Sequence, residues 1–312
     1  YGVLQAHGNL CFKHSRAHNT ILADSIGQAC DVSGFGWIPR FMTGKKISYA
    51  LGDASHAYSG IDEKLSKQYQ RKTGIEISRK TGFGNPGVTR FRRHIARLLP
   101  DIVVIYDELE AQTPIQWAFH LNARDNLTKK GDNHISTYNQ FACADAYVYC
   151  NRGMQVEVTD QFLAPPIDVQ GKLGKGKKSY PNHWHGSFVT MDKMKKTRLL
   201  TIIKVTPDGT EVVSPEEIKK DYSGNSIWKI NGYRILAQMD ADKPSLLEVR
   251  DENDTCALLA GQAATKITLG GKTYETSCIG SSLLVEKDAE GKSTVIEKTD
   301  VLPDAVVYGN QY

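Results

Sequence analysis

Apolar and polar residues alternate along most of the chain, which is the pattern of strands that bury one face. Runs rich in β-branched and aromatic residues are separated by clusters of Gly, Asn, Asp and Pro. The turn at 99–101 predicts a hairpin between two long antiparallel strands. The pattern therefore predicts an all-β protein, a multi-sheet antiparallel β-sandwich. The clearest predicted strands are 19–24, 46–53, 89–98, 102–111, 115–123, 146–151, 155–163, 186–192 and 198–207.

Two stretches carry helical signals, and both predict short helices. In 61–72, apolar residues recur at a spacing of four, as on one helix face. In 214–222, Ser214 is a candidate N-cap, Pro215 suits the first helical position, and Glu217 completes a capping box.

The length of the predicted strands and the composition of their connectors change after about residue 235. Strand-like segments become shorter, and the connectors are rich in Asp, Gly and Lys. We therefore expect two domains: a central antiparallel β-sandwich over 1–235 and a small C-terminal β domain over 236–312.

Composition excludes several classes of protein. The chain has 312 residues, of which 40% are hydrophobic and 24% charged, as in a globular protein. No segment is long and apolar enough for a membrane span. No RRM, KH, zinc-finger or helix-turn-helix pattern occurs, so nucleic acid is not an expected partner.

Lysines are clustered although the net charge is only +4. The segment 171–186 contains Lys177 and Lys178 and ends in aromatic residues, and 192–198 is a second basic stretch. Clustered cations beside aromatics attract polyanions through their summed field. A solvated lysine-rich loop is the alternative interpretation.

Six cysteines are too few for a disulfide-built scaffold of this length. Cys143 and Cys150 could pair across a hairpin. The alternative is that they are free thiols that behave as small hydrophobic residues.

Histidines supply the candidate chemistry. His14 and His18 lie four apart before a predicted strand, so they do not share a helix face. Either could be an ordinary histidine satisfied by a hydrogen bond. His183 and His185 lie two apart on a predicted strand and would share a face, as half of a metal or anion site. Trp184, on the other face, could stack on a sugar.

Other polar residues have simpler interpretations. We expect His120 to pack as a polar residue in the interior, and Asp53 to accept hydrogen bonds from the amides of a turn. No nucleophile elbow, Walker loop, dinucleotide fingerprint or HExxH motif occurs. The residues alone therefore identify no catalytic centre.

Three segments in a distinctive order resemble one family. They are SRAHNTILADSIGQ at 15–28, YALGDASHAYSG at 49–60 and VTRFRRHIARLLPDIVVIYDELEA at 88–111. They are similar to the central β region of heparinase II/III-like polysaccharide lyases. The resemblance implies the heparinase II/III C-terminal type of β-sandwich, preceded in the longer protein by an N-terminal α/α toroid.

The resemblance also implies a function and a site. Such lyases cleave uronic-acid-containing glycans by β-elimination, on heparan sulfate, chondroitin or alginate. Tyr1 resembles a catalytic tyrosine, and His18 resembles a zinc ligand whose partners lie upstream. The implied substrate-binding residues are His14, Lys177, Lys178, His183, Trp184 and His185.

Several further expectations follow from the resemblance. The HxHxD-like segment of the family is absent, so the chain is expected to be inactive by itself. The longer protein is expected to be periplasmic or secreted. One alternative is a noncatalytic carbohydrate-binding or structural module. Another is an enzyme complete in this chain, with His14, His18, Tyr58 and His183 as candidate catalytic groups.

Overall fold

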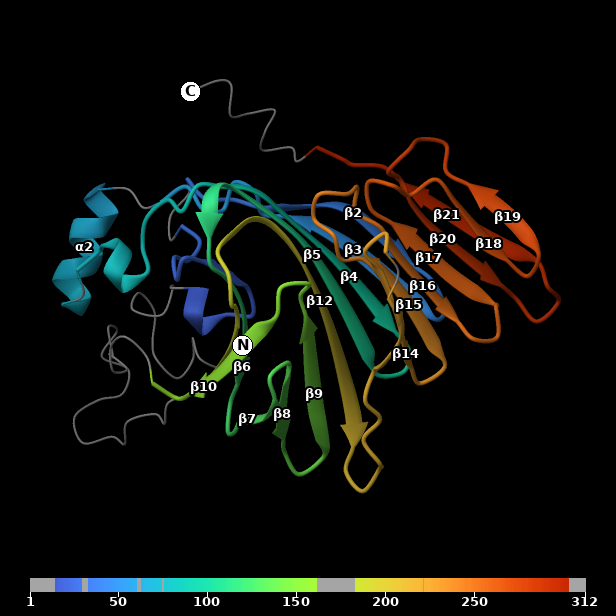
Figure 1. The fold of residues 1–312 in the computed structure, drawn as a ribbon, viewed down its shortest axis with the longest axis horizontal. Helices are drawn as coiled ribbons and strands as arrows, with labels where there is room; N and C mark the ends of the chain where they lie inside the picture. The colour runs from blue at the N-terminus through green and yellow to red at the C-terminus, as the bar shows by residue number, and fades with distance from the viewer. Residues whose placement is uncertain are drawn as a thin grey trace.

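A computed structural model gives the fold of residues 15–29, 33–60, 63–74, 76–161, 183–220 and 222–302. Strands dominate these residues and pair antiparallel throughout (Figure 1). They form three large sheets and a separate two-stranded hairpin. The prediction of an all-β, multi-sheet antiparallel protein is confirmed.

The eight-stranded sheet is the central layer. Its middle strand, β5, is buried on both faces over most of its length because another sheet covers each side. The hairpin predicted at 99–101 joins β4 to β5, with Leu98 opposite Ile102. In spatial order its strands are β2 (Trp37–Thr43), β3 (Ile47–Asp53), β4 (Val88–Leu98), β5 (Ile102–Ile115), β12 (Met194–Pro207), β9 (Ala142–Tyr149), β8 (His134–Tyr138) and β7 (Thr128–Gly131).

A four-stranded sheet covers one face of the central sheet. Its inner side chains, including Trp117, Phe119 and Phe188, pack against Phe91 and Leu109 of the central sheet. Polar residues of the same strands therefore face away from this core. The strands in spatial order are β1 (Ile21–Ala23), β6 (Trp117–Ala123), β11 (Trp184–Thr190) and β10 (Met154–Thr159).

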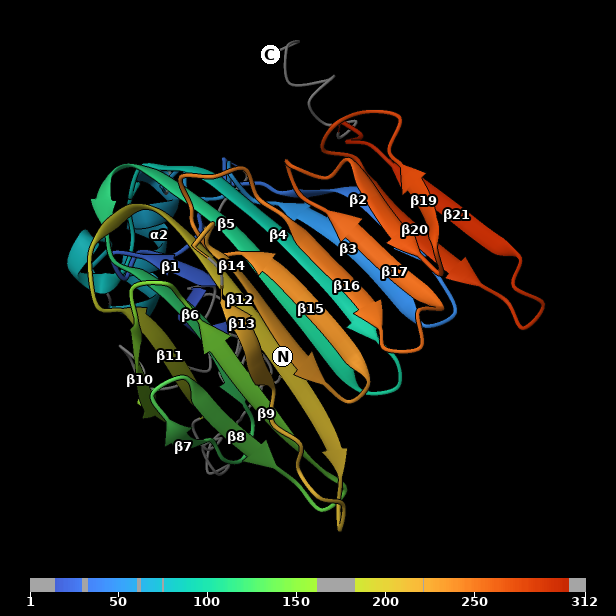
Figure 2. The ribbon, with the colours of Figure 1, turned by 45° about the vertical axis from the view of Figure 1, so that its right-hand side comes forward.

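A seven-stranded sheet covers the other face of the central sheet (Figure 2). Tyr49, Tyr106 and Leu200 of the central sheet share a core with Trp228 and Leu258 of this one. Its strands in spatial order are β13 (Glu216–Lys220), β14 (Asn225–Ile230), β15 (Tyr233–Gln238), β16 (Leu247–Asp251), β17 (Cys256–Ala260), β20 (Ser282–Lys287) and β21 (Ser293–Lys298).

A third core lies on the far side of the seven-stranded sheet. There Leu259 and Val285 pack against the hairpin of β18 (Lys266–Leu269) and β19 (Lys272–Glu275). The position expected for a domain boundary, residue 235, lies inside β15, whose neighbours β14 and β16 flank it in the sequence. The sheet and its core thus extend across that position.

The two helix predictions had opposite outcomes. The first is confirmed as α2 (Glu63–Thr73), and short 3-10 turns η2 (Ser15–Ala17) and η3 (Arg79–Thr81) also occur. The second is wrong, because Glu216–Lys220 is the edge strand β13, paired with β14. All five residues are exposed, so a helix there would bury no apolar face. Pairing at the sheet edge satisfies the backbone instead.

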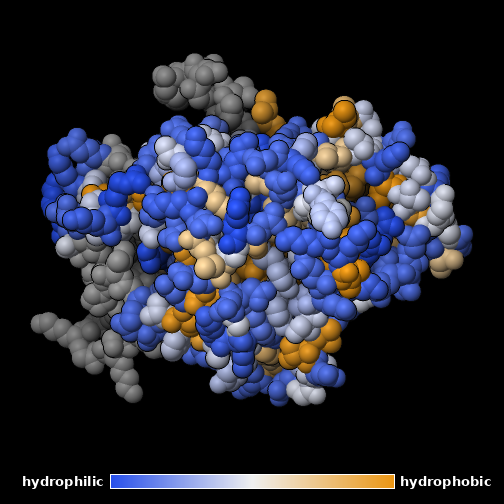
Figure 3. All heavy atoms as spheres, in the orientation of Figure 1, coloured by the Kyte–Doolittle hydropathy of each residue, from blue (hydrophilic) through white to orange (hydrophobic). Residues whose placement is uncertain are grey.

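The cysteine alternatives are also settled for part of the chain. Cys143 and Cys150 are free thiols, so of the two alternatives the pairing across a hairpin does not form. Among the described residues, no helix is long and apolar enough to cross a bilayer. On the face shown in Figure 3, hydrophobic residues form small separate groups within a mainly hydrophilic surface.

Candidate functional site: an aromatic groove beside a histidine-bearing sheet

An open groove of about 280 Å³ lies where β3 and β4 meet the start of the described chain. All three segments that carry the family resemblance contribute to its lining. Thr20 and Gln28 come from the first segment, Asp53 from the second, and Phe91 and Arg93 from the third. Residues separated by more than seventy positions along the chain therefore meet at one surface feature. The complete lining is Thr20, Gln28, Gly36, Trp37, Ile38, Gly52, Asp53, Ala54, Phe91 and Arg93.

Arg93 is the fixed cation of the groove. Its Nε and Nη2 donate to the two carboxylate oxygens of Asp107, at 2.7 and 2.9 Å. The guanidinium also lies 5.2 Å from the ring centre of Phe91 and 5.1 Å from that of Phe119. Asp107 is fully buried, so the pair is held rigidly in one geometry.

An aromatic cluster extends the groove along the edge of the central sheet. Phe35 stacks on His56 with ring centres 5.0 Å apart, and Trp37 lies 6.1 Å from the same imidazole. Phe35 is 41% exposed, and His56 is also exposed. Exposed rings beside planar polar side chains are suited to stacking on the apolar face of a sugar.

Glycine allows this aromatic segment to lie close to β3. A Cβ at Gly36 would be 2.9 Å from the backbone oxygen of Asp53, which is too close for any other residue. The alternation of glycine with Phe35 and Trp37 in 34–37 could have indicated the platform in advance. The sequence prediction missed it and interpreted the stretch around His56 as a turn. Asp53 does accept a turn amide, from Ser55 at 3.0 Å, as predicted.

Asn19 connects the groove to the outer face of the four-stranded sheet. Its backbone oxygen accepts from Nη1 of Arg93 at 3.3 Å, and its side-chain oxygen accepts from the backbone N–H of Asn122 at 2.8 Å. Asn122 is the register partner of His185. Asn19 thus hydrogen-bonds to a residue of the groove and to a residue of the histidine-bearing sheet.

His120 and His185 lie together on that outer face. Their rings stack with centres 5.9 Å apart, and Nε2 of His120 is 2.9 Å from the Ser187 hydroxyl. His120 is 1% exposed, which confirms its prediction as interior polar packing. Burial, assisted by the nearby charge of Arg16, lowers the pKa of His185 to about 4. His185 is therefore neutral at physiological pH.

Of the predicted pair, His185 lies on β11 and His183 directly precedes that strand. His183 is buried, and burial together with the charge of Arg124 lowers its pKa. Trp184 points the other way, as predicted, and is half-buried against the core. Gly186 leaves no empty space there, because a Cβ would be 2.9 Å from Ile135 of β8.

His18 follows the short turn η2 and is half-buried. Among the described residues, no group of three or more His, Cys, Asp or Glu could hold a metal ion. These residues therefore do not by themselves fit a zinc site at His18. Tyr1, His14, Lys177 and Lys178 lie outside the described residues, so their assigned roles stay predictions.

Comparisons with known proteins give structural likeness only. No family model matches the chain, and no curated protein matches its sequence. Its fold is similar to that of a mutant of heparan sulfate lyase HepC from Pedobacter heparinus, with a TM-score of 0.47 and 12% identity, covering 85% of this chain and 31% of that one.

Two structures of heparinase III are also similar. One has a TM-score of 0.46 and 10% identity, covering 84% of this chain and 31% of that one. The other has a TM-score of 0.43 and 10% identity, covering 92% and 30% respectively. The chain spans about a third of the length of these structures.

Proposed function

We propose that this chain is the β-sandwich portion of a polysaccharide lyase that cleaves uronic-acid-containing glycans by β-elimination. The observation that carries the proposal is the convergence of the three resembling segments on the aromatic groove. Arg93 offers positive charge at the groove, and Phe35 and Trp37 offer rings for stacking. An acidic sugar has the complementary groups, a carboxylate and an apolar ring face.

The chemistry assigned to the whole enzyme needs more than the groove. β-Elimination requires that the uronate carboxylate be neutralised, that a base remove the adjacent proton, and that an acid protonate the leaving oxygen. Arg93 is already paired with Asp107, so its place here is to bind and orient rather than to exchange protons. The proposal therefore retains a toroid in the longer protein, with Tyr1 at the junction as the candidate catalytic tyrosine.

The remaining assignments belong to the same proposal. His18 is proposed as a zinc ligand that needs further ligands from outside the described residues. The longer protein is proposed to be periplasmic or secreted, because acidic polysaccharides of this kind are extracellular. The second candidate function, a noncatalytic carbohydrate-binding module, is favoured by the same exposed rings and needs no proton transfer.

Binding to heparan sulfate, chondroitin sulfate and alginate oligosaccharides tests the groove directly. Phe35→Ala is expected to weaken binding by at least about tenfold, because stacking of a sugar on an exposed ring is lost. Phe141→Ala is the matched control, since Phe141 is also exposed but lies on the distant β8–β9 turn. Equal weakening by both substitutions, or no binding of any of the three glycans, would contradict the proposed site.

Two further measurements separate the lyase from the binding module. The intact mass of the natural polypeptide, compared with the 34.6 kDa of this chain, shows whether a toroid-sized region is present. The natural polypeptide is then assayed for unsaturated uronate products. Saturable binding with no unsaturated product from that polypeptide would favour the noncatalytic module.

A further inference from the structure

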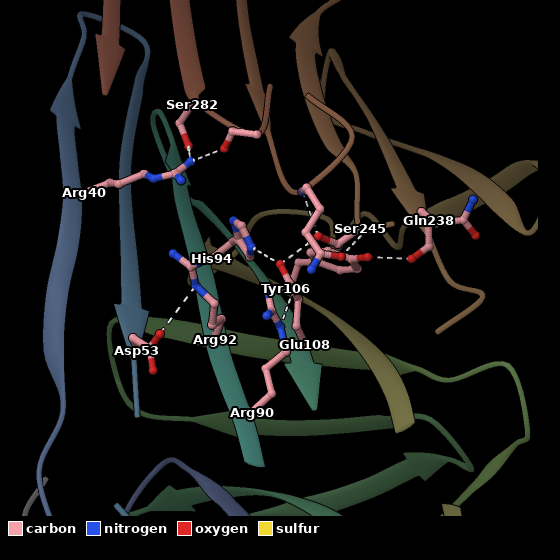
Figure 4. Close-up of polar contacts among 12 residues, drawn as sticks. Arg40, Asp53, Arg90, Arg92, His94, Tyr106, Glu108, Gln238, Ser245 and Ser282 are labelled. Atoms are coloured by element: carbon pink, nitrogen blue, oxygen red, sulfur yellow. Dashed lines mark hydrogen bonds and ion pairs between the residues drawn. The ribbon is translucent and has the colours of Figure 1, made fainter. Parts of the chain in front are cut away.

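A second cavity lies on the opposite face of β3 and β4 from the aromatic groove. It has a volume of about 320 Å³ and is located between the central and the seven-stranded sheets. Arg40, Arg90 and Arg92 line it together with His94 and Glu108 (Figure 4). The loops at 261–262 and 279–280 supply the other wall. Three guanidinium groups thus surround one small cavity.

Each of these arginines is held in place by an acceptor. Nε of Arg40 donates to Asp300 at 2.6 Å, and Nη2 of Arg92 donates to both oxygens of the same carboxylate at 2.8 Å. Nε and Nη2 of Arg90 lie 2.7 and 2.6 Å from Oε2 of Glu108. The guanidinium groups are therefore positioned before any ligand arrives.

One nitrogen of each guanidinium is left for a ligand. Nη2 of Arg40, Nη1 of Arg90 and Nη1 of Arg92 contact no acceptor among the residues that the structure describes. Each of these nitrogens carries two N–H groups, which are directional donors for oxyanions. A cavity of this size accepts an oxyanion together with an attached small ring.

A buried chain of hydrogen bonds links the lining residues Arg40, His94 and Glu108 through two residues outside the lining. Nη1 of Arg40 donates to the Ser282 hydroxyl at 3.0 Å, which donates to the Tyr49 hydroxyl at 3.1 Å. The Tyr49 hydroxyl is 2.8 Å from Nδ1 of His94, and Nε2 of His94 is 2.8 Å from Glu108. This buried chain holds Arg40, His94 and Glu108 in place. The donors that remain for a ligand are those of the arginines.

The surrounding charges leave an excess of positive charge. Asp53 and Asp300 balance two of the lining arginines, and Glu108 balances the third. Arg198 is a fourth cation, 1% exposed and opposite Glu108 on β12. Among the described residues its Nε and Nη1 have no hydrogen-bond partner. Glu110 lies opposite both Arg90 and Lys196. The charges of Glu110 and Lys196 cancel, so these two residues add no net charge.

We propose that this cavity is a binding site for a single oxyanion group, a sulfate or a carboxylate, coordinated by Arg40, Arg90 and Arg92. The group is either a free inorganic anion or part of an acidic monosaccharide. Bidentate pairing with guanidinium groups suits both planar and tetrahedral oxyanions. The site shares no lining residue with the aromatic groove, so it does not depend on the function proposed there.

Calorimetric titration of the chain with sodium sulfate, sodium glucuronate and sodium acetate tests the proposal at constant ionic strength. Saturable binding is expected for sulfate, glucuronate or both. Arg92→Gln is expected to weaken it by at least about tenfold, the effect of losing one charge-assisted hydrogen bond. Arg97→Gln is the matched control, because Arg97 is an exposed arginine on the same strand. It should leave binding unchanged.

A second variant keeps the test valid if Arg92→Gln fails to fold. Ile279 is 80% exposed at the wall of the cavity, so Ile279→Trp blocks the cavity and leaves the ion pairs intact. It is expected to abolish binding while preserving the circular dichroism spectrum. Tighter binding of glucuronate than of both sulfate and acetate would assign a sugar-borne carboxylate, and preference for sulfate would assign a sulfate group. No saturable binding, or equal binding by wild type and Ile279→Trp, would overturn the proposal.

Discussion

Glu108 is the buried carboxylate on which the polar network between the two larger sheets depends. Its side chain is 2% exposed. Oε1 accepts from the Ser245 hydroxyl and is paired with Nε2 of His94, both at 2.8 Å, while Oε2 accepts two contacts from Arg90. Burial alone would raise the pKa of Glu108, but the His94 hydrogen bond and the charges of His94, Arg90 and Arg198 hold it well below its usual range.

Replacing Glu108 with Gln keeps the volume and removes the charge. The amide has one oxygen, so either Arg90 or the pair His94 and Ser245 would face an N–H₂ group instead of an acceptor. Arg90, whose side chain is 22% exposed, would also lose its charge partner. Breaking a buried ion pair on one side costs about 3 to 5 kcal/mol, and we expect a loss in that range.

Urea titrations followed by circular dichroism measure this loss as a shift of the unfolding midpoint at unchanged m-value. Glu110→Gln is the matched control, because Glu110 lies two residues along the same strand and is half-buried. It should cost less than about 1 kcal/mol. A loss below about 1 kcal/mol for Glu108→Gln, or one equal to that of the control, would refute the assignment of Glu108 as the centre of the network.

Three further predictions concern other titratable groups. Because burial lowers the pKa of His185 to about 4, an NMR titration of its ring should show no protonation at about pH 6. This group should also make the protein less stable as the pH falls from about 6.5 toward 4. A titration midpoint above pH 6 would contradict the burial argument. Burial opposes ionisation of Asp251, yet hydrogen bonds from Lys46 and neighbouring groups lower its pKa to about 2, so its stabilising contribution is complete above about pH 4 and disappears toward pH 2. Asp251→Asn should therefore flatten the acid dependence of the urea midpoint in that interval, and an unchanged dependence would disprove the contribution. Burial, with the charge of Asp251, raises the pKa of Cys256 to about 12. A maleimide should therefore label exposed Cys278 in the folded protein and Cys256 only after unfolding, which mass spectrometry of the peptides measures. Rapid labelling of Cys256 in native buffer would contradict this prediction.

Local sequence determined the strands and one of the two helices. Alternation of apolar and polar residues is a local signal, and it located β3 and β4 to within one residue at each end. It located only one end of β5 and of β12, because β5 continues to Ile115 and β12 begins at Met194. It failed for Glu216–Lys220, where the capping signals for a helix were present but no apolar face accompanied them. Pairing with β14, a tertiary contact, decided that segment.

The sequence also supplied the candidate site in part. Three separate segments carried the family resemblance, and the same segments line the aromatic groove. The contribution of Phe35, Trp37 and His56 was not predicted, because the ring stacking joins residues from different strands and turns. The order of residues along the chain does not by itself indicate which aromatic rings will be in contact in the folded protein.

Only the tertiary structure decided where the charges lie. The sequence shows arginines in 90–93 and carboxylates in 107–110 as if each were on an exposed strand face. Strand register placed Arg93 opposite Asp107 and Arg92 opposite Glu108. The two outer sheets then buried the carboxylates and left the arginines half-buried. Charge pairing between strands depends on register and on what covers each face, which are set by packing of the whole chain rather than by any local segment.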